Sequence, residues 1–467
     1  MISRSLSGLV TDFTSLALVC GVVGCQPAHR APSLAAPEIN PVAVATPGRT
    51  ALPVVLPVST VAPPPQLDLD GDDEPPGEAD TGDPLLPGHF ERVGRAPLAL
   101  QRICDLTSFG GALYAAHSNR PLGTDGATVT RYRPADPHPF SVAFDWNRAG
   151  EPSKGGGAGQ GFLRVHAIQR RLFVADADPP YNGFGISEPG TEGFVFVSNE
   201  AGEFAKPRMP GHLPPRPPDA QGKAGAAVLP RAYHVIDAIR FREHIYAATG
   251  AVPPGQRAWH GASPAALLVE GEIGARFAYA ADYPYPYVDG VWRFTYLVRF
   301  RDRLYAGLQD YDGREPNDYV FFSPPRDRQV ITRDDLHAAR ATEAGTAQTV
   351  RWYADGGLLY WIAWSSEGVA LRVTSDGDTW KIVSLPADLG APTDIVRFRG
   401  ALHVLTTRAL LRLGDGGPTL LAHIEEKERS PFELDDSFCA APLATFQGAL
   451  FAGGQRDGAL YRFREGP

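Results

Sequence analysis

Short apolar stretches recur along the chain from residue 89 onward, and each is joined to a second one by a polar or glycine-bearing turn. Apolar and polar residues that alternate on both sides of such a turn predict a β-hairpin. A third apolar stretch follows most copies, as in EGFVFVSN, DYVFFSP and GALYRF. Aligned on the apolar residue that opens the second stretch, the copies are SFGGALYAAH (Leu113), AIQRRLFVAD (Leu172), RFREHIYAAT (Ile245), RFRDRLYAGL (Leu304), YADGGLLYWIA (Leu359), RFRGALHVLT (Leu402) and TFQGALFAGG (Leu450).

Seven copies of one hairpin predict an all-β fold, a seven-bladed β-propeller spanning residues 89–467. The anchors are 43 to 73 residues apart, and a four-stranded blade needs about 40–50, so the excess is loop. A single twisted sheet buries neither face, whereas seven sheets stacked around an axis bury both. The competing interpretation is a pair of β-sandwich domains, which have similar strand spacings.

The two ends of the predicted ring complement each other. The last copy stops after three strands, and GHFERVGR precedes the first copy without belonging to it. We therefore predict that residues near Phe90–Val93 supply the outer strand of the last blade and so close the ring.

Composition agrees with a fold of many turns and little helix, because glycine (50) and proline (44) exceed a fifth of the 467 residues. The formal net charge of −9 is uneven: residues 26–88 hold nine acids and two arginines, which leaves the predicted propeller near neutral. No basic stripe is present, so we expect no nucleic-acid partner.

The N-terminus is predicted to carry a signal for export. Residues 13–25, FTSLALVCGVVGC, form an apolar run of the length of a signal h-region, too short to span a bilayer. The run ends in Val22-Val23-Gly24-Cys25, which resembles a bacterial lipobox. That resemblance implies a signal peptide over residues 1–25, a lipid on Cys25 that anchors the chain to a membrane of the cell envelope and, from Gln26, sorting to the outer membrane. An ordinary secretory signal or a misplaced start codon is the alternative.

Residues 26–88 are predicted to be a disordered spacer. Fourteen prolines between residues 27 and 88 remove backbone donors and favour extended conformations. The acids that follow in LDLDGDDEPPGEADTGDP repel one another and keep the spacer extended. Asp68, Asp70 and Asp72 have the alternate spacing of a calcium loop, but Asp73 stands where glycine is needed and Ala79 where glutamate is needed.

Two cysteines remain once Cys20 leaves with the signal and Cys25 is lipidated. Cys104 and Cys439 both lie near the predicted start of an inner strand, one in the first blade and one in the last. Because closure makes these blades neighbours, we predict a disulfide between them in an oxidising compartment. Two unrelated buried thiols are the alternative.

The repeats resemble those of kelch and Asp-box (sialidase-type) propellers. LYRF after FAGG is similar to kelch repeats, and TSDGDTW (residues 374–380) resembles an Asp-box one residue short, with SNEAGEF (residues 198–204) as a weaker match. In those families the Asp-box is a structural turn between outer strands, so the resemblance implies fold rather than catalysis. Sialidases also carry an Arg-Ile-Pro element, which this chain lacks, so sialidase activity does not follow.

Candidate function lies in the long loops between second and third strands and between blades, which emerge on one face of a propeller. They predict a surface that binds a protein or glycan partner through aromatic residues. The alternative is a hydrolase of carbohydrate or another polymer, with Asp176 and Asp178, or Asp310 and Asp312, as acid and base. A metal held by such acids with His166 or His234 is a further possibility, although we predict no metal, no cofactor and a monomer. The candidate residues are Asp176, Asp178, Tyr181, Trp259, His260, Tyr283, Tyr285, Tyr287, Asp310 and Asp312.

Overall fold

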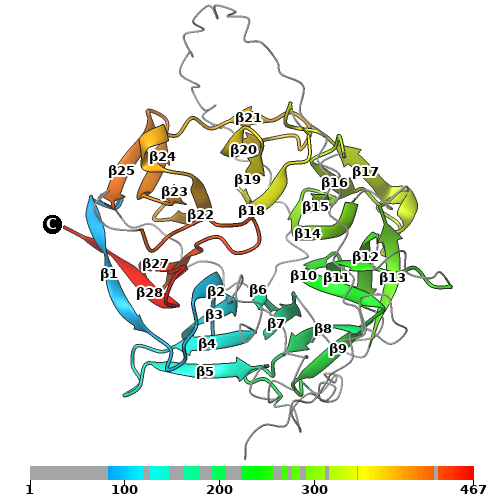
Figure 1. Ribbon diagram of the computed structural model, residues 1–467, viewed down its shortest axis with the longest axis horizontal. Helices are drawn as coiled ribbons and strands as arrows, with labels where there is room; N and C mark the ends of the chain where they lie inside the picture. The colour runs from blue at the N-terminus through cyan, green and yellow to red at the C-terminus, as the bar shows by residue number, and fades with distance from the viewer. Residues whose placement is uncertain are drawn as a thin grey trace, which may run out of the picture. The chain divides into compact units, whose positions relative to one another are not determined.

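The computed structural model describes eleven segments of the chain: residues 83–118, 127–146, 161–177, 192–205, 222–255, 264–270, 276–283, 291–310, 315–343, 345–424 and 430–466. These residues form seven antiparallel sheets of four strands each, arranged around a central axis (Figure 1). The described part of the chain is therefore a seven-bladed β-propeller, as the repeats predicted. Each anchor residue lies at the start of the second strand of its blade.

The strands of each blade run outward from the axis in chain order, except that the last blade takes its outer strand from the N-terminal side. Blades 1 to 4 consist of β2 (Arg102–Phe109), β3 (Ala112–Ser118), β4 (Thr128–Tyr132), β5 (Phe140–Asp145); β6 (Phe162–Ile168), β7 (Arg171–Asp176), β8 (Glu192–Val197), β9 (Gly225–Pro230); β10 (Ala232–Phe241), β11 (His244–Ala251), β12 (Ala265–Glu270), β13 (Phe277–Asp282); and β14 (Val291–Phe300), β15 (Arg303–Asp310), β16 (Tyr319–Phe322), β17 (Leu336–Ala339).

Blades 5 to 7 follow the same order, and two 3-10 turns, η1 (Arg333–Asp335) and η2 (Ala387–Leu389), complete the regular structure of the described segments. These blades consist of β18 (Gln348–Asp355), β19 (Leu358–Ser365), β20 (Gly368–Thr374), β21 (Lys381–Ile382); β22 (Pro392–Phe398), β23 (Ala401–Thr406), β24 (Ala409–Gly414), β25 (Gly417–His423); and β26 (Leu443–Phe446), β27 (Ala449–Gly453), β28 (Ala459–Glu465), β1 (Gly88–Arg95).

Strand β1 is the outer strand of blade 7. It pairs antiparallel with β28, with Gly88 opposite Glu465 and Phe90 opposite Phe463. In Figure 1 the blue strand of the N-terminal side lies beside the red strand of the C-terminal side. The two ends of the propeller chain thus meet within one sheet, at the position predicted for Phe90–Val93.

The hydrophobic core of the described residues is divided into seven clusters. Each fills the space between two neighbouring blades, and the one between blades 4 and 5 extends into the channel to Leu163, Ile236 and Phe438. Between blades 1 and 2, for example, Phe162 stacks on Phe144 of the preceding blade, and Phe196 packs against the same ring at a tilt. Between blades 4 and 5, Trp361 is fully buried against Tyr319 and Trp352. Both faces of each sheet are covered in this way, which supplies the burial that a single four-stranded sheet lacks.

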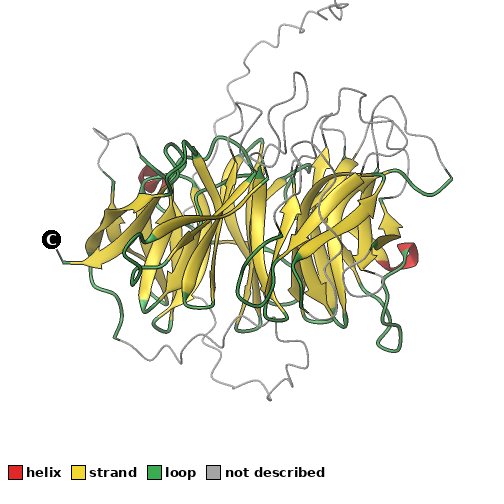
Figure 2. Ribbon diagram, turned by 90° about the horizontal axis from the view of Figure 1, so that it is seen from below, coloured by secondary structure: helices red, strands yellow, loops and turns green. Residues whose placement is uncertain are grey.

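The two faces of the ring differ in their connections (Figure 2). Strands 1 and 2 of every blade are joined by two-residue turns, such as Gly110–Gly111 and Gly356–Gly357, whose positive φ angles suit tight hairpins. We call this side the short-turn face. The connections from strand 2 to strand 3 and from one blade to the next leave from the opposite side, the long-looped face. No helix in the described segments is long and apolar enough to cross a membrane.

Candidate functional site

The mouth of the central channel on the long-looped face is built from the first residues of the inner strands and the last residues of the second strands. Antiparallel pairing brings these ends together, as Arg102 with Ser118 in blade 1 and Phe162 with Asp176 in blade 2. A side chain in either position therefore points toward the axis or toward the neighbouring blade. This edge is where the sequence predicted the functional surface.

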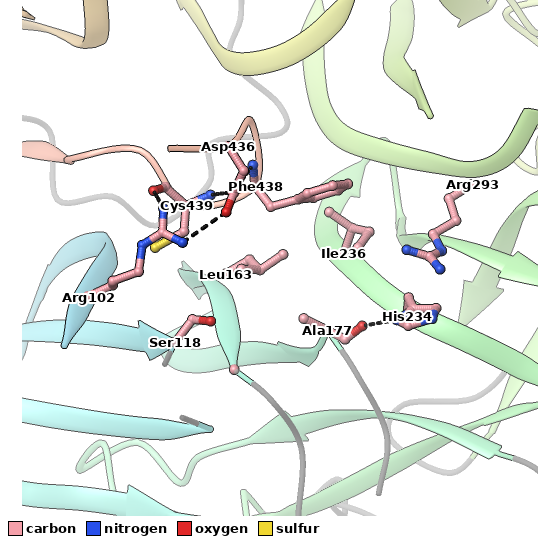
Figure 3. Close-up of a pocket in the computed structure, with 11 residues that line it drawn as sticks. Arg102, Ser118, Leu163, Ala177, His234, Ile236, Arg293, Asp436, Phe438 and Cys439 are labelled. Atoms are coloured by element: carbon pink, nitrogen blue, oxygen red, sulfur yellow. Dashed lines mark hydrogen bonds and ion pairs between the residues drawn. The ribbon is translucent and has the colours of Figure 1, made fainter. Parts of the chain in front are cut away.

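Residues 430–442, which precede β26, cross this mouth, and we call them the channel plug. Figure 3 shows Phe438 of the plug directed toward Ile236 of blade 3. The Phe438 side chain is 8% exposed and packs among Leu163, Ala177 and Ile236. The plug therefore contacts blades on the far side of the channel from its own.

Polar contacts hold the plug on several sides. Arg102 of blade 1 donates to the Asp436 carboxylate at 2.9 Å and to the Cys439 carbonyl at 2.6 Å. The Tyr296 hydroxyl of blade 4 donates to the Phe438 carbonyl, and Ser437 Oγ donates to Gln348 Oε1 of blade 5 at 2.7 Å. These bonds reach three blades, so the plug is part of the folded ring.

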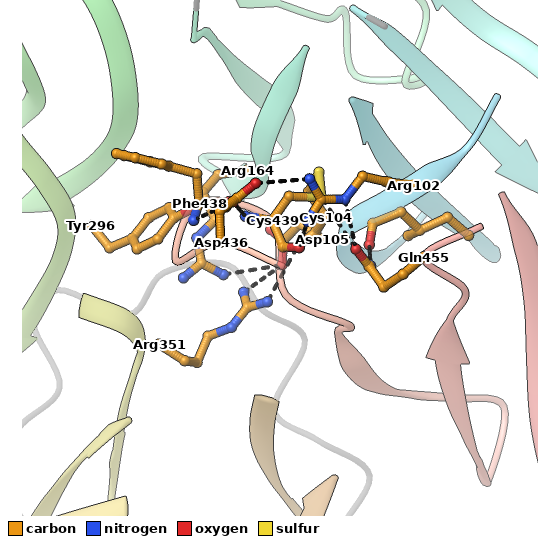
Figure 4. Close-up of a disulfide and its surroundings, with 11 residues drawn as sticks. Arg102, Cys104, Asp105, Arg164, Tyr296, Arg351, Asp436, Phe438, Cys439 and Gln455 are labelled. Carbon is orange, nitrogen blue, oxygen red and sulfur yellow. Dashed lines mark hydrogen bonds and ion pairs between the residues drawn. A yellow bond between two sulfur atoms is a disulfide. The ribbon is translucent and has the colours of Figure 1, made fainter. Parts of the chain in front are cut away.

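Cys104 of β2 and Cys439 of the plug form a disulfide, with their Cα atoms 4.5 Å apart (Figure 4). The sequence had placed both cysteines at the start of an inner strand. Cys104 is the third residue of β2, whereas Cys439 lies four residues before β26, within the plug. The bond therefore joins blade 1 to the plug as well as to the last blade.

Little open space remains at the mouth. The cavity there has a volume of about 20 Å³, which is room for a single water molecule. It is enclosed by residues of blades 1 to 4 and of the plug, namely Arg102, Ser118, Gly161, Leu163, Ala177, His234, Ile236, Arg293, Asp436, Phe438 and Cys439. Among the described residues, then, the channel mouth is a closed surface.

Below the plug, one position repeats in every blade, eight residues before the anchor, and its mostly charged side chains face the axis. In blade order this position holds Asp105, Arg164, Asp237, Tyr296, Arg351, Asp394 and Pro442. The first six form what we call the channel ring. A β-bulge beside this position in blades 1 to 6 turns the side chain inward.

Arginines and acids of the channel ring lie within ion-pair distance of one another. Arg351 approaches Asp105 at 3.0 Å and Asp394 at 3.2 Å, and Arg164 approaches Asp105 at 3.2 Å. The Arg164 guanidinium also lies 4.2 Å from the centre of the Tyr296 ring. Buried charges cost little only when they are paired in this way.

Each ring aspartate also accepts a backbone N–H from the next blade. Asp105 accepts from Val165 at 3.0 Å, Asp237 from Leu297 at 2.9 Å and Asp394 from Leu443 at 2.8 Å. All three carboxylates are nearly inaccessible to solvent. Their bonding positions are used to join blades, so they serve the fold rather than a substrate.

Ionisation within the ring follows from burial and pairing. Burial opposes the charge on Asp237, but His166, whose Nε2 lies 2.7 Å from Asp237 Oδ1, outweighs it and lowers the pKa of Asp237. Burial likewise opposes the charge on His166, yet Asp237 raises the pKa of His166 above its ordinary value. Burial dominates at Asp394 and raises its pKa to about 7.

Asp176, a predicted acid of the hydrolase interpretation, is fully buried at the end of β7. It lies on the same side of the strand as Leu172 and Val174, which pack against blade 1. Neither carboxylate oxygen has a hydrogen-bond partner among the described residues, and burial raises the pKa of Asp176 to about 8. The carboxyl is therefore protonated at neutral pH and faces the core instead of the channel.

Tyr283 and Asp310 lie close together at the ends of blades 3 and 4. Tyr283 was predicted to be part of a binding surface and Asp310 to be a catalytic acid, but both side chains are used within the fold. Tyr283 is 7% exposed and packs with Phe294 in the core between these blades, so its ring is not available to a partner. Asn317 donates to the Tyr283 hydroxyl at 3.3 Å and to Glu315 Oε1 at 2.6 Å. Glu315 in turn donates its backbone N–H to Asp310 Oδ2 at 2.7 Å, so Asp310 caps a loop.

The histidines suggested as metal ligands have other partners: His166 pairs with Asp237, and His234 bonds the Ala177 carbonyl at 2.9 Å. Across the described segments, no group of three or more His, Cys, Asp or Glu is placed to hold a metal. The remaining predicted residues lie outside the described segments, namely Cys25, Asp178, Tyr181, Trp259, His260, Tyr285, Tyr287 and Asp312.

The turn at residues 374–380 lies between β20 and β21, the outer strands of blade 5. Asp376 Oδ1 accepts the backbone N–H of Asp378 and of Thr379, and these bonds lower the pKa of Asp376. The Trp380 indole donates to the Tyr319 hydroxyl of blade 4 at 2.8 Å. The turn thus links two blades, which is a structural task.

The channel plug and the channel ring were both missed in the sequence. The plug lies in the connection between blades 6 and 7, outside the repeated hairpins. The ring had a signal, because Asp105, Asp237 and Asp394 stand at the same distance from their anchors. Aligning the copies a few residues further upstream would have found it.

No protein-family model matches the chain, and no curated protein matches it. Solved structures of low similarity include the AfRom2 CNH domain (9% identity, TM-score 0.43, covering 81% of this chain and 99% of that one). Others are the Raptor protein of Chaetomium thermophilum (11%, 0.46, 82% and 29%) and an α-L-arabinanase of Penicillium chrysogenum complexed with arabinobiose (10%, 0.36, 82% and 99%). At these scores they carry no argument about activity.

Proposed function

We propose that this chain is a lipid-anchored propeller of the cell envelope that binds a protein or glycan partner through its long-looped face. In this proposal residues 1–25 are a lipoprotein signal, the lipid on Cys25 holds the chain to the outer membrane, and the spacer runs from residue 26 to residue 82. The spacer was predicted to end at residue 88, but Leu85 is buried in the core between blades 6 and 7 and β1 begins at Gly88. Residues 83–467 form the binding scaffold.

The binding proposal is carried by one observation: the aspartates of the channel ring already bond neighbouring blades. The aspartates at the axis join neighbouring blades, and the plug fills the mouth above them. Function then falls to the loops around the plug, which a rigid ring holds in place. Exposed aromatic residues on such loops are suited to sugar rings and to protein side chains.

The direction of the spacer supports the same proposal. Strand β1 begins at Gly88 opposite Glu465, the last residue of β28, and this end of the sheet lies on the short-turn face. The spacer therefore joins the propeller on the side away from the long loops. A lipid anchor at its far end leaves the long-looped face free to meet a partner.

The hydrolase alternative gains nothing from the described residues. A glycoside hydrolase needs two carboxyl groups about 5–9.5 Å apart across an open site. Asp176 faces the core, and Asp310 caps the loop that begins at Glu315. The position and bonding of Asp376 support a relationship to Asp-box propellers. Such a relationship concerns the fold alone.

The test uses the full chain on an array of envelope glycans, together with a variant that carries Trp259→Ala, Tyr285→Ala and Tyr287→Ala. We expect binding to at least one glycan class and a loss of about tenfold or more in the variant, because stacked aromatics dominate such contacts. The matched control carries Arg170→Ala and Arg326→Ala, two exposed residues of the short-turn face. Equal binding by all three proteins would refute the assignment to the long-looped face.

Anchoring is tested separately by feeding labelled palmitate to producing cells. The intact chain is expected to incorporate label and to sediment with membranes, and the Cys25→Ser variant to do neither. Label that persists in the Cys25→Ser variant would refute the lipobox interpretation.

A further inference from the structure

Solvent reaches the central axis from the short-turn face. The position six residues before each anchor lies on the same side of the inner strand as the channel ring, one step nearer the short turns. Five of the seven side chains at this position are half-buried, namely Thr107, His166, Val298, Tyr353 and Val396. The side chains of the ring are buried, and Phe438 of the plug closes the opposite end. The turn follows three residues later, so this level lies about 10 Å inside the short-turn face.

His166 is held in a fixed orientation at this level. Its Nε2 lies 2.7 Å from Asp237 Oδ1, and the Asp237 side chain is 1% exposed whereas that of His166 is 30% exposed. Because the ionised carboxylate accepts, Nε2 carries the proton of this bond, and Nδ1 has no hydrogen-bond partner among the described residues. Nδ1 therefore donates to an occupant of the channel when the imidazole is protonated.

Arg240 of β10 supplies a second positive charge. The residue is half-buried, and its Nε is buried without a hydrogen-bond partner. Within the described segments no acid lies within ion-pair distance of the Arg240 guanidinium. Its N–H groups are available to an anion.

The repeated sequence RFR shows what an arginine at this position ordinarily does. RFR precedes the first turn of three blades, at residues 240–242, 299–301 and 397–399. In blade 6, Arg397 donates its backbone N–H to the Tyr353 hydroxyl of blade 5 at 2.9 Å and its guanidinium to Asp355 at 2.7 Å. The first arginine of RFR thus lies beside the axis-facing side chain of the preceding blade and pairs with an acid at the end of that strand.

The same arrangement between blades 2 and 3 lacks the acid. Arg240 stands five residues before its anchor and His166 six before its own, as Arg397 and Tyr353 do, and the strand registers agree. At the position of Asp355, however, blade 2 has Ile168. Arg240 is therefore placed beside His166 with its charge unmatched.

The charges at the axis add up to a positive excess. The three ring aspartates are matched by Arg164, Arg351 and protonated His166, so Arg240 is additional. Burial and Arg164 oppose the charge on His166, but Asp237 and Asp105 outweigh them and raise the pKa of His166. The imidazolium is thus favoured where an anion would meet it.

We propose that His166 and Arg240 bind a small oxyanion, a phosphate or a carboxylate group, at the axis on the short-turn face. The anion accepts from His166 Nδ1 and from the Arg240 guanidinium, while Asp237 holds the imidazole through Nε2. The depth of the site favours a free small molecule over a lipid headgroup, because a flat bilayer meets the turns first. The site is independent of the binding proposed for the long-looped face.

The experiment titrates inorganic phosphate, and separately acetate, into the full chain at constant ionic strength and about pH 6.5. Histidine Cε1 resonances are followed by NMR, and His166→Asn identifies the resonance of His166. We expect a saturable shift of that resonance with a Kd of the order of millimolar. The bound anion should also raise the pKa of His166, because an adjacent negative charge favours the imidazolium.

Arg240→Gln should weaken the affinity about tenfold, since it removes one charge-assisted contact. This variant breaks no bond among the described residues, so its urea midpoint should stay unchanged. The matched control is Arg397→Gln, at the same repeated position in blade 6, where the guanidinium already pairs with Asp355. It should leave the affinity unchanged.

The absence of a saturable shift with either anion would overturn the proposal, and so would equal weakening by Arg240→Gln and Arg397→Gln. A shift caused by phosphatidylglycerol vesicles but by neither free anion would also overturn it and would assign the site to a lipid headgroup. Weakened anion binding by Arg240→Gln with unchanged glycan binding would support a site separate from the long-looped face.

Discussion

Substituting Asp176 with asparagine should change the way stability depends on pH. In the unfolded chain this carboxyl ionises near its ordinary pKa of 3.8, whereas burial raises its pKa in the folded protein to about 8. Between these values the folded protein holds one proton more than the unfolded chain. The free energy of unfolding therefore falls as pH rises, by about 1.4 kcal/mol per pH unit, and the fall ends near pH 8, where both states are ionised.

The Asp176→Asn variant lacks this proton and so lacks the slope. Its free energy of unfolding, relative to the unsubstituted protein, should rise by about 4 kcal/mol between pH 5 and pH 8. Asp176→Leu should show the same slope from a higher starting value, because an apolar group in that core site requires no hydrogen bond. Urea denaturation at half-unit pH intervals measures both.

Asp302→Asn is the control, since Asp302 is 67% exposed and, among the described residues, pairs with the exposed Arg326; its curve should stay within about 0.5 kcal/mol of the unsubstituted protein. A difference curve for Asp176→Asn that is flat from pH 5 to pH 8 would refute the reasoning. It would show that Asp176 is ionised in the folded state. In that case Asp176 would again be a candidate acid of the long-looped face.

Three further changes test other parts of the ring. Asp237→Ala should lower the free energy of unfolding by about 3–5 kcal/mol, because Leu297 loses its acceptor, whereas Asp237→Asn should cost about 1–2 kcal/mol; equal effects in urea denaturation would contradict the inter-blade role. Replacing both Cys104 and Cys439 with serine opens a loop of 335 residues and should cost about 6 kcal/mol by chain entropy, and a loss under about 1 kcal/mol would argue against that account. Asp376→Asn should speed hydrogen exchange at the amides of Asp378 and Thr379, since a weaker acceptor replaces the carboxylate; unchanged rates would contradict its turn-forming role.

The features that repeat along the chain could be predicted from the sequence. Seven hairpins with anchors such as Leu113 and Leu450 show a period, and a period predicts identical blades that must stack to bury their faces. The closing strand could also be predicted, because the last copy contained only three strands and the stretch GHFERVGR belonged to no copy. The pairing of Cys104 with Cys439 then required only that the first and last blades be neighbours.

Features that occur once in the chain, or that depend on how deeply a side chain is buried, could not be predicted. The channel plug has no repeat to align with, and its sequence, SPFELDDSFCAAP, reads as an ordinary polar loop. Tyr283 stands beside proline and tyrosine in a loop-like stretch, which predicts exposure. In the structure it directly follows β13, and its ring packs in the core between blades 3 and 4. Asp176 was taken for a surface acid because aspartate is seldom fully buried without a partner.

The seam between blades 7 and 1 is closed at the axis by a covalent bond as well as by polar contacts. In blades 1, 3 and 6 a ring aspartate bonds the next blade, but blade 7 has Pro442 at this position and can offer no carboxylate to blade 1. Across this seam Ile103 donates its N–H to the Gly454 carbonyl at 2.9 Å and Gly458 donates to the Gln101 carbonyl at 2.8 Å. The Gln455 side chain of blade 7 also donates to the Ile103 carbonyl at 2.6 Å.

This seam is also the interface where the two ends of the propeller chain meet, so opening it frees the most conformational entropy. Strand β1 closes the outer edge through backbone pairing with β28. The Cys104–Cys439 bond closes the inner edge, beside the hydrogen bonds of Gln455 with Ile103 and Arg102, and fixes the plug at the same time. Reduction should therefore weaken the seam and the channel mouth together, while the remaining six interfaces keep their packing.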